Sequence, residues 1–229
     1  MTILLIDPEH RSVAANHELA KRYQSHLTLA RSCLAAIGGT ECRVWSYLEA
    51  SPVAVERLNP MAMVIGGSST GWDRYEFSEM TGLFDLIRTT SRPLLGICAG
   101  HQLIGRAYGA PWGPLTQSDG AGVVSEQAFG IGQLTETGYL PLAIDPSCPL
   151  FAGLQSTATL CQSHYWQLTA VPPGFTLRAS TPVCQVQAIE HEDRPLFGVQ
   201  FHPERYDDQQ PAGHRVLRNF IDLARDRSG

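Results

Sequence analysis

Cys98 lies in a stretch whose residue types and spacing are typical of a nucleophile on a sharp turn. The stretch from Gly96 to Gly100 reads GICAG, with an apolar run before it and a helical pattern after it. Small residues on both sides let a strand reverse into a helix while the nucleophile takes a strained backbone conformation. The free N–H groups at the helix start would point at the sulfur and favour the thiolate over the thiol. Cys98 is therefore the candidate nucleophile.

A reactive cysteine needs a base, and the base needs a group that orients it. His202, Pro203 and Glu204 offer both, directly after an apolar run that ends at Phe201. If that run is a strand, it would bring His202 to the same sheet edge as Cys98. Pro203 would then fix the backbone so that Glu204 reaches the imidazole. The alternative, which we keep for the other histidines, is a residue without a catalytic role.

Gly66 and Gly67 end another apolar run and would let main-chain N–H groups approach a substrate closely. Together with the N–H of Ala99 they could form an oxyanion hole, which stabilises the negative charge that develops on a carbonyl oxygen. A plain turn is the alternative interpretation. A phosphate-binding loop fits poorly, because no Gly-Lys-Ser/Thr sequence follows.

The elements that must position these residues alternate between strand and helix in the first half of the chain. The pattern predicts, in order, strand 3–6, helix 14–37, strand 41–45, a short helix after Ser51-Pro52, strand 61–65, helix 77–88, strand 94–97 and helix 100–108. Such alternation favours a parallel sheet covered on both faces. Ligands of such sheets bind beyond the carboxyl ends of the strands, where Gly67 and Cys98 would lie.

From Gly122 onward turns are frequent and the apolar runs are short. These runs lie at 123–124, 131–137, 142–144, 158–161, 175–179, 183–189 and 196–200, and a helical pattern follows at 213–225. We expect antiparallel strands appended to the sheet and a closing helix. The predicted fold class is therefore α/β, with a mostly parallel central sheet and appended antiparallel strands, in a single domain over residues 1–229.

Composition argues against several function classes. The 229 residues carry a formal charge of -5, which leaves no basic surface for nucleic acid or an anionic membrane. The chain starts as a strand and has no apolar run of membrane-spanning length, so we expect a cytoplasmic protein. The six cysteines are scattered without a C-x-x-C pair, which predicts neither a disulfide framework nor a metal site.

The GICAGHQ stretch from Gly96 to Gln102, together with FHPE from Phe201 to Glu204, resembles the class I glutamine amidotransferase family over nearly the whole chain. The resemblance implies a flavodoxin-like three-layer sandwich. It also implies a triad with Cys98 as nucleophile, His202 as general acid and base, and Glu204 as the orienting group.

The resemblance assigns further residues to the site. It implies that Gly67 and Ala99 provide the oxyanion hole. The substrate-binding positions that it implies are Gln102, Ser163, His164, Tyr165 and Trp166.

Two departures from the family pattern bear on the partner. After the two glycines the family usually has Pro, whereas this chain has Ser68-Ser69-Thr70-Gly71. The Ser-His segment continues with Tyr165-Trp166 in place of the Gly-Asp of guanylate-forming members. Both segments are expected near the surface through which ammonia would leave. The loop from Ser68 to Arg74, with Gly71 as a hinge, is the element that a partner would reorder.

The resemblance implies hydrolysis of L-glutamine through a γ-glutamyl thioester, with no metal or other cofactor. The sequence holds no ATP-binding fingerprint and no second domain to use the ammonia, so we expect a separate ATP-dependent synthetase or amidating partner. Two alternatives stay open. One is a stand-alone hydrolase of γ-glutamyl amides or peptides, and the other is a non-enzymatic binding module with a relic triad.

Overall fold

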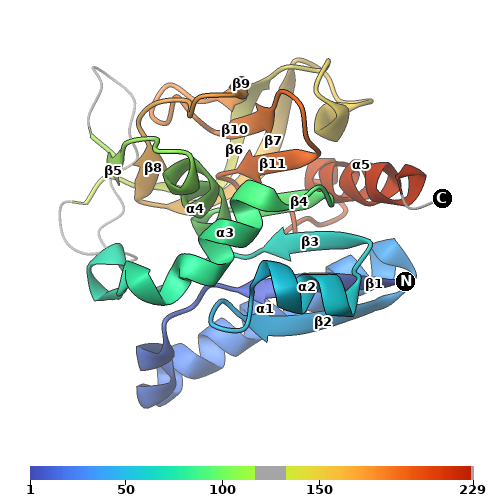
Figure 1. Cartoon of the computed structure of the whole chain (residues 1–229). Helices are drawn as coiled ribbons and strands as arrows, with labels where there is room; N and C mark the ends of the chain where they lie inside the picture. The colour runs from blue at the N-terminus through green and yellow to red at the C-terminus, as the bar shows by residue number, and fades with distance from the viewer. Residues whose placement is uncertain (117–132, 228–229) are drawn as a thin grey trace.

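A central sheet organises the computed structural model, which describes residues 1–116 and 133–227 (Figure 1). The strand order is β2-β1-β3-β4-β11-β10-β9-β6-β7. The parallel strands are β1 (Thr2–Asp7), β2 (Glu41–Ser46), β3 (Ala62–Ile65), β4 (Leu94–Ile97) and β11 (Leu196–Val199). The antiparallel strands are β6 (Glu136–Ile144), β7 (Thr157–His164), β9 (Phe175–Ser180) and β10 (Ala188–His191). The predicted mostly parallel sheet with appended antiparallel strands is confirmed.

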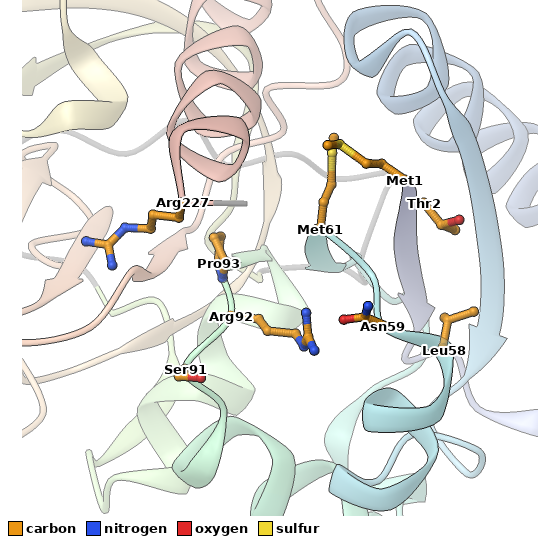
Figure 2. Close-up of a pocket in the computed structure, with 9 residues that line it drawn as sticks. All are labelled: Met1, Thr2, Leu58, Asn59, Met61, Ser91, Arg92, Pro93 and Arg227. Atoms are coloured by element: carbon orange, nitrogen blue, oxygen red, sulfur yellow. The ribbon is translucent and has the colours of Figure 1, made fainter. Parts of the chain in front are cut away.

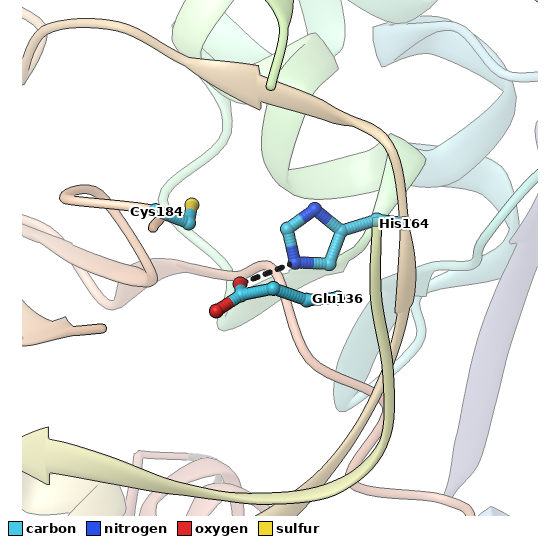
Figure 3. Close-up of side chains that lie close together, drawn as sticks. All are labelled: Glu136, His164 and Cys184. Carbon is cyan, nitrogen blue, oxygen red and sulfur yellow. Dashed lines mark hydrogen bonds and ion pairs between the residues drawn. The ribbon is translucent and has the colours of Figure 1, made fainter. Parts of the chain in front are cut away.

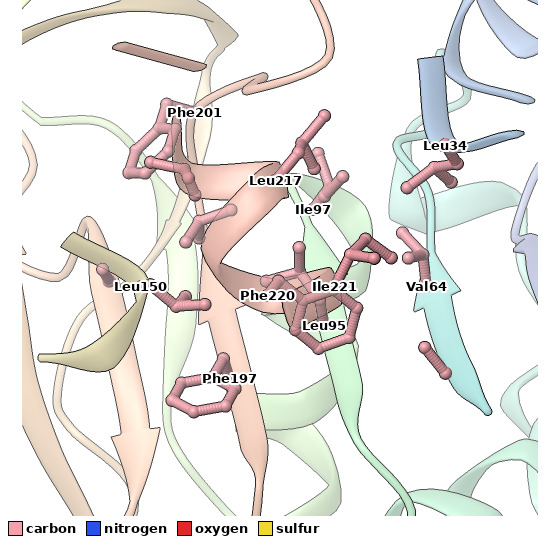
Figure 4. Packing of buried hydrophobic residues seen from close by; sticks show 14 of the residues in the cluster. Leu34, Val64, Leu95, Ile97, Leu150, Phe197, Phe201, Leu217, Phe220 and Ile221 are labelled. Carbon is pink, nitrogen blue, oxygen red and sulfur yellow. The ribbon is translucent and has the colours of Figure 1, made fainter. Parts of the chain in front are cut away.

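Helices cover both faces of the parallel strands, because successive side chains of a strand point to opposite faces. The helices are α1 (His17–Gly38), α2 (Pro52–Leu58), α3 (Thr81–Thr89), α4 (Ala99–Ala107) and α5 (Ala212–Asp226). In β1, Ile3 packs in the core beneath α1 and α5, whereas Leu4 packs in the core beneath α2, α3 and α4. Figure 4 shows the first core, where Phe220 and Ile221 of α5 meet the sheet. The three-layer sandwich is therefore confirmed.

Helix boundaries differ from the sequence pattern where a cap decides them. α1 begins at His17 and not at residue 14, because the Asn16 side chain accepts the N–H of Leu19 at 3.1 Å. The preceding residues Arg11–Ala15 form a 3-10 turn. Similarly, the helix predicted for 77–88 is a 3-10 turn over Phe77–Met80 followed by α3.

The second half differs from the sequence pattern in its strand lengths. The runs at 142–144 and in the second part of 131–137 belong to one long strand, β6. The strand predicted for 183–189 is confined to β10, since Thr181 and Cys184 exchange hydrogen bonds of 2.9 Å that close a turn. A separate pair of short strands, β5 (Trp112–Pro114) and β8 (Trp166–Leu168), was not predicted. The run at 123–124 and residues 131–132 lie outside the described residues.

The described parts of the chain contain no helix with the length and apolarity that a bilayer crossing requires. All six cysteines are free thiols, as the sequence predicted. The single-domain organisation and the cytoplasmic location stay predictions.

Candidate active site

The backbone at Cys98 has the strained conformation that the sequence predicts for a nucleophile turn. Cys98 precedes the first residue of α4 and has φ 52° and ψ −102°, a left-handed φ that side-chain-bearing residues rarely adopt. Two glycines make this turn possible. A Cβ on Gly96 would lie 2.5 Å from the Gly100 carbonyl carbon, and one on Gly100 would lie 2.3 Å from the Ile65 oxygen. The turn therefore depends on glycine at both positions.

The pairing of β4 with β11 brings His202 to Cys98. Ile97 stands opposite Val199 in the parallel register, and the Cys98 N–H donates to the Val199 oxygen at 2.8 Å. The backbone beyond β11 is held as well, because the N–H of His202 donates to the Cys161 oxygen of β7 at 2.8 Å. Both side chains therefore reach the carboxyl edge of the sheet.

His202 contacts both of its predicted partners. Its Nδ1 lies 2.7 Å from Oε1 of Glu204, and its ring also hydrogen-bonds the Cys98 side chain. His202 and Glu204 are both buried, and a Cβ on Gly67 would lie 3.0 Å from Cε1 of His202. The structure thus brings Cys98, His202 and Glu204 into one connected group beside Gly67.

The charges of this group determine its protonation. Burial by itself would lower the pKa of His202, but the charges of Glu204 and Cys98 and the hydrogen bonds to both raise it to about 9. Burial would raise the pKa of the Glu204 carboxyl, but the adjacent His202 holds that pKa below its usual range. An imidazolium beside a carboxylate is the expected state at neutral pH.

Gly67 and Ala99 flank the sulfur, as an oxyanion hole requires. The loop before Gly67 is fixed because the Gly66 N–H donates to the Ile6 oxygen, and the Gly66 oxygen accepts the N–H of Gly100, each at 3.0 Å. A Cβ on Gly67 would lie 3.6 Å from Cβ of Cys98. Ala99 follows Cys98 as the first residue of α4.

A small cavity of about 30 Å³ opens beside Cys98 and gathers the other predicted residues. It is lined by Ser68, Thr70, Trp72, Cys98, Ala99, Gln102, Ser163, His164, Tyr165 and Trp166. Every position that the resemblance assigns to substrate binding is therefore at this cavity. The sequence had placed Trp72 only in the neighbouring loop, and its contact with the cavity is new.

Gln102 connects two walls of the cavity. Its Oε1 accepts Nε1–H of Trp72 at 2.8 Å, and its Nε2 donates to the Trp166 oxygen and to Oε1 of Gln200, both at 2.9 Å. The Trp72 ring packs against Tyr75, with centroids 5.0 Å apart. Gln102 thus ties the loop that carries Trp72 to the segment that carries Trp166.

Comparison with known proteins identifies the family. The family model "Glutamine amidotransferase class-I" matches residues 23–223. The chain belongs to the class I glutamine amidotransferase family. The predictions of an enzyme and of this family are therefore confirmed.

This amidotransferase has relatives with a common name. It is 30% identical over 167 residues to a glutamine-hydrolyzing subunit of GMP synthase from Methanothermobacter thermautotrophicus, across 73% of this chain and 76% of the relative. It is 32% identical over 185 residues to the longer glutamine-hydrolyzing GMP synthase of Clostridium perfringens, across 79% of this chain and 32% of that one. The fold matches a crystal structure from Thermoplasma acidophilum, assigned as a GMP synthase subunit, with a TM-score of 0.74 at 23% identity, across 100% of this chain and 96% of that one.

A buried cluster beneath the amidotransferase cavity contains residue types that can hold a metal ion. Potential ligand atoms of Glu136, His164 and Cys184 all lie within 4.8 Å of one another (Figure 3). His164 contacts Oε2 of Glu136 at 3.0 Å through Nε2 and the Trp166 oxygen at 3.1 Å through Nδ1. The Cys184 thiol donates to the Val186 oxygen.

The remaining positions on the Glu136 carboxylate are also used. Thr181 donates to Oε1 and Gln187 to Oε2, each at 2.6 Å. Because protein groups occupy these ligand atoms, the arrangement fits a hydrogen-bonded support for the Ser163–Trp166 segment better than a metal centre.

Two further cavities lie outside the predicted substrate contacts. One of about 720 Å³ is at the opposite edge of the sheet, between Met1, Met61 and Pro93, which precede or begin β1, β3 and β4 (Figure 2). Another of about 230 Å³ lies between α1 and the far side of His202 and Glu204. His101, which follows the nucleophile turn, is fully buried, and burial lowers its pKa to about 3. It keeps the structural role expected of the other histidines.

Proposed function

We propose that this chain hydrolyses the side-chain amide of L-glutamine through a γ-glutamyl thioester on Cys98. The observation that supports this most directly is the contact of Cys98 with the buried His202–Glu204 pair, in a chain of the amidotransferase family. A nucleophile, a base and a group that orients the base are the parts that acyl transfer requires.

In the first half-reaction, the Cys98 thiolate attacks the side-chain carbonyl carbon of glutamine. The C=O electrons move to oxygen, and the N–H groups of Gly67 and Ala99 stabilise the oxyanion. His202 donates its proton to the nitrogen as the C–N bond breaks. Ammonia leaves, and the γ-glutamyl group stays on the sulfur as a thioester.

In the second half-reaction, neutral His202 takes a proton from water, and the resulting hydroxide attacks the thioester. The second oxyanion collapses with release of glutamate, and Cys98 and His202 return to the thiolate and the imidazolium. Glu204 stabilises the imidazolium throughout and keeps Nε2 directed at the reacting atoms. No group other than the glutamine and one water is consumed.

Gln102 and the segment from Ser163 to Trp166 are the proposed contacts to the glutamine. The cavity of about 30 Å³ holds roughly one water molecule, so glutamine needs more space than this arrangement gives. The loop from Ser68 to Arg74, which carries Trp72, must therefore move when substrate enters. Such a movement agrees with a loop that a partner reorders.

We propose a separate ATP-dependent synthetase as the consumer of the ammonia. Two relatives, each named as a glutamine-hydrolyzing subunit of GMP synthase, are covered to 76% and 78% of their length by this chain. This coverage supports an amidotransferase subunit without a fused synthetase. The relatives' name makes a GMP-forming synthetase the first partner to test. Because Tyr165-Trp166 stands in the substrate segment, other ATP-dependent amidating enzymes of the same host belong in the same assay.

Glutamate and ammonia release by the purified chain, with and without each candidate synthetase, tests this proposal. We expect slow hydrolysis alone and a higher kcat with the correct partner. Cys98→Ala should abolish glutamine-dependent product formation by the pair and leave the reaction with ammonium salt intact. Rapid hydrolysis of γ-glutamyl compounds by the chain alone, with no response to any synthetase, would instead support a stand-alone hydrolase.

A further inference from the structure

Glu9 lies beyond the end of β1 and is buried against the loop that follows β3. Its Oε2 accepts both the N–H and the hydroxyl of Ser69 at 2.6 Å. Its Oε1 accepts the hydroxyl of Ser68 at 3.1 Å and the N–H of His10 at 3.0 Å. A charged acceptor makes these hydrogen bonds stronger than bonds between neutral groups.

The contact needs a carboxylate and not merely a polar side chain. Each Glu9 oxygen faces a backbone N–H, from His10 on one side and from Ser69 on the other. A glutamine side chain has one acceptor oxygen and one NH₂ group. In either orientation its NH₂ would therefore meet a backbone N–H, which cannot accept a hydrogen bond.

A second contact joins the same loop to the segment after β1. The hydroxyl of Tyr75 lies 2.6 Å from the Ser68 hydroxyl and 2.9 Å from the Pro8 oxygen. The Thr70 N–H donates to the Ser68 hydroxyl at 3.1 Å. Ser68 is thus held from several sides, and Glu9 is the charged group among its partners.

These bonds fix the peptide of Gly67, which lies between two anchored neighbours. On one side, Gly66 is bonded to Ile6 and to Gly100. On the other side, Ser68 and Ser69 are bonded to Glu9. Without Glu9, the direction of the Gly67 N–H would be set mainly from the Gly66 side.

We infer that Glu9 is a positioning residue that directs the Gly67 N–H toward the oxyanion formed at Cys98. This inference rests on the proposed glutamine hydrolysis. Glu9 contacts neither the sulfur nor His202 in the described structure, so it acts through Ser68 and Ser69. An interaction that matters only when the oxyanion exists affects kcat and leaves KM nearly unchanged.

Glu9→Gln tests the inference, because it preserves the size of the side chain. Loss of a complete oxyanion-hole donor costs about 10²–10³ in kcat, and we expect a displaced donor to cost roughly 10- to 100-fold with KM within about threefold. Alkylation of Cys98 by iodoacetamide, a displacement that forms no oxyanion, should keep the wild-type rate. Glu9→Ala should show the same kcat loss, and thermal unfolding of both variants reports how much protein is folded.

Glu49→Gln is the matched control. Glu49 also accepts a loop N–H, that of Ser46 at 2.8 Å, but it is exposed and its single bond can be kept by an amide oxygen. Its kcat and KM should equal those of the wild type.

Three outcomes would overturn the inference. Wild-type kcat in folded Glu9→Gln would show that the loop holds its position without the carboxylate. A raised KM at constant kcat would mean that Glu9 shapes the substrate pocket. Slow iodoacetamide labelling would mean that it supports the nucleophile itself. The proposed function fails separately, and the Glu9 inference with it, if the wild type turns over no glutamine with any partner.

Discussion

At the residue scale, Cys98 differs from the other cysteines in its surroundings. It lies at the start of α4 and beside His202, whereas burial raises the pKa of Cys42 to about 11 and that of Cys148 to about 12. Burial likewise raises the pKa of the thiols of Cys33, Cys161 and Cys184. A thiolate is the reactive form, so these five thiols should react slowly.

We therefore predict that a glutamine-like chloroketone at neutral pH alkylates Cys98 well before any other cysteine. Peptide mass spectrometry over a time course measures this, and Cys98→Ala should remove the rapid phase. Preferential labelling of a different thiol would assign the nucleophile elsewhere.

His202 and Glu204 should contribute unequally to turnover. His202 moves protons in both half-reactions, and general acid–base groups contribute about 10²–10⁴-fold. His202→Asn should therefore reduce kcat by roughly that factor, and Glu204→Gln should reduce it less because it removes only the orienting charge. Steady-state glutamate release measures both. Equal losses would contradict the assignment, and His164 would then be the next histidine to test.

The same pair predicts the alkaline side of the pH–rate profile. The pKa of His202 is raised from 6.5 to about 9, so the imidazolium that protonates the leaving nitrogen persists at neutral pH and is lost as pH rises through about 9. Turnover should fall over that range. Glu204→Gln removes a charge that raises this pKa, so its decline should occur at lower pH. An unchanged alkaline limb in Glu204→Gln would show that another group titrates there.

At the scale of elements, Gln102 on α4 holds the loop that carries Trp72. The Trp72 N–H occupies the Gln102 oxygen at 2.8 Å in the narrow cavity. Trp72→Phe removes this donor but keeps a ring beside Tyr75. A neutral hydrogen bond is worth about 0.5–1.5 kcal/mol, so KM for glutamine should fall by roughly 2- to 10-fold.

Gln102→Ala provides the opposite comparison. It removes the proposed substrate contact, so KM should rise while kcat changes less. Kinetics over a wide range of glutamine concentration separate the two constants. A higher KM in Trp72→Phe would show that the Trp72 N–H assists binding of glutamine.

At the scale of the whole molecule, α5 closes the core beneath the strands that carry the triad. Phe220 is fully buried there (Figure 4). Gly213, near the start of α5, lies against Pro203, where an added Cβ would be 2.3 Å from the carbonyl oxygen. Helix packing therefore supports the segment between His202 and Glu204.

Phe220→Ala should destabilise the fold without changing the chemistry of the site. Truncation of a buried Phe to Ala costs about 3–5 kcal/mol of the free energy of unfolding. Urea denaturation measures the loss, and iodoacetamide labelling of the protein that remains folded should stay selective for Cys98. A loss below about 1 kcal/mol would mean that the core rearranges to fill the space.

The sequence by itself predicted the parts of the molecule that depend on local pattern. Apolar periodicity predicted the strands and helices, and the parallel register of β4 with β11 then placed His202 at the edge where Cys98 lies. The small residues around Cys98 predicted its sharp turn because the steric demand acts within a few residues. Boundaries were less accurate, since the cap at Asn16 and the turn at Thr181 compete with periodicity.

Tertiary structure alone decided the contacts between distant segments. Glu9 and Ser69 are 60 positions apart, Trp72 and Gln102 are 30 apart, and Glu136 and His164 are 28 apart. Nothing in the local pattern of Glu9 distinguishes it from a solvated glutamate. Whether such a side chain is exposed or bonded to a catalytic loop depends on how β1 and β3 pair and where their loops then meet. Burial makes that contact strong, because a carboxylate removed from water must find its donors within the protein.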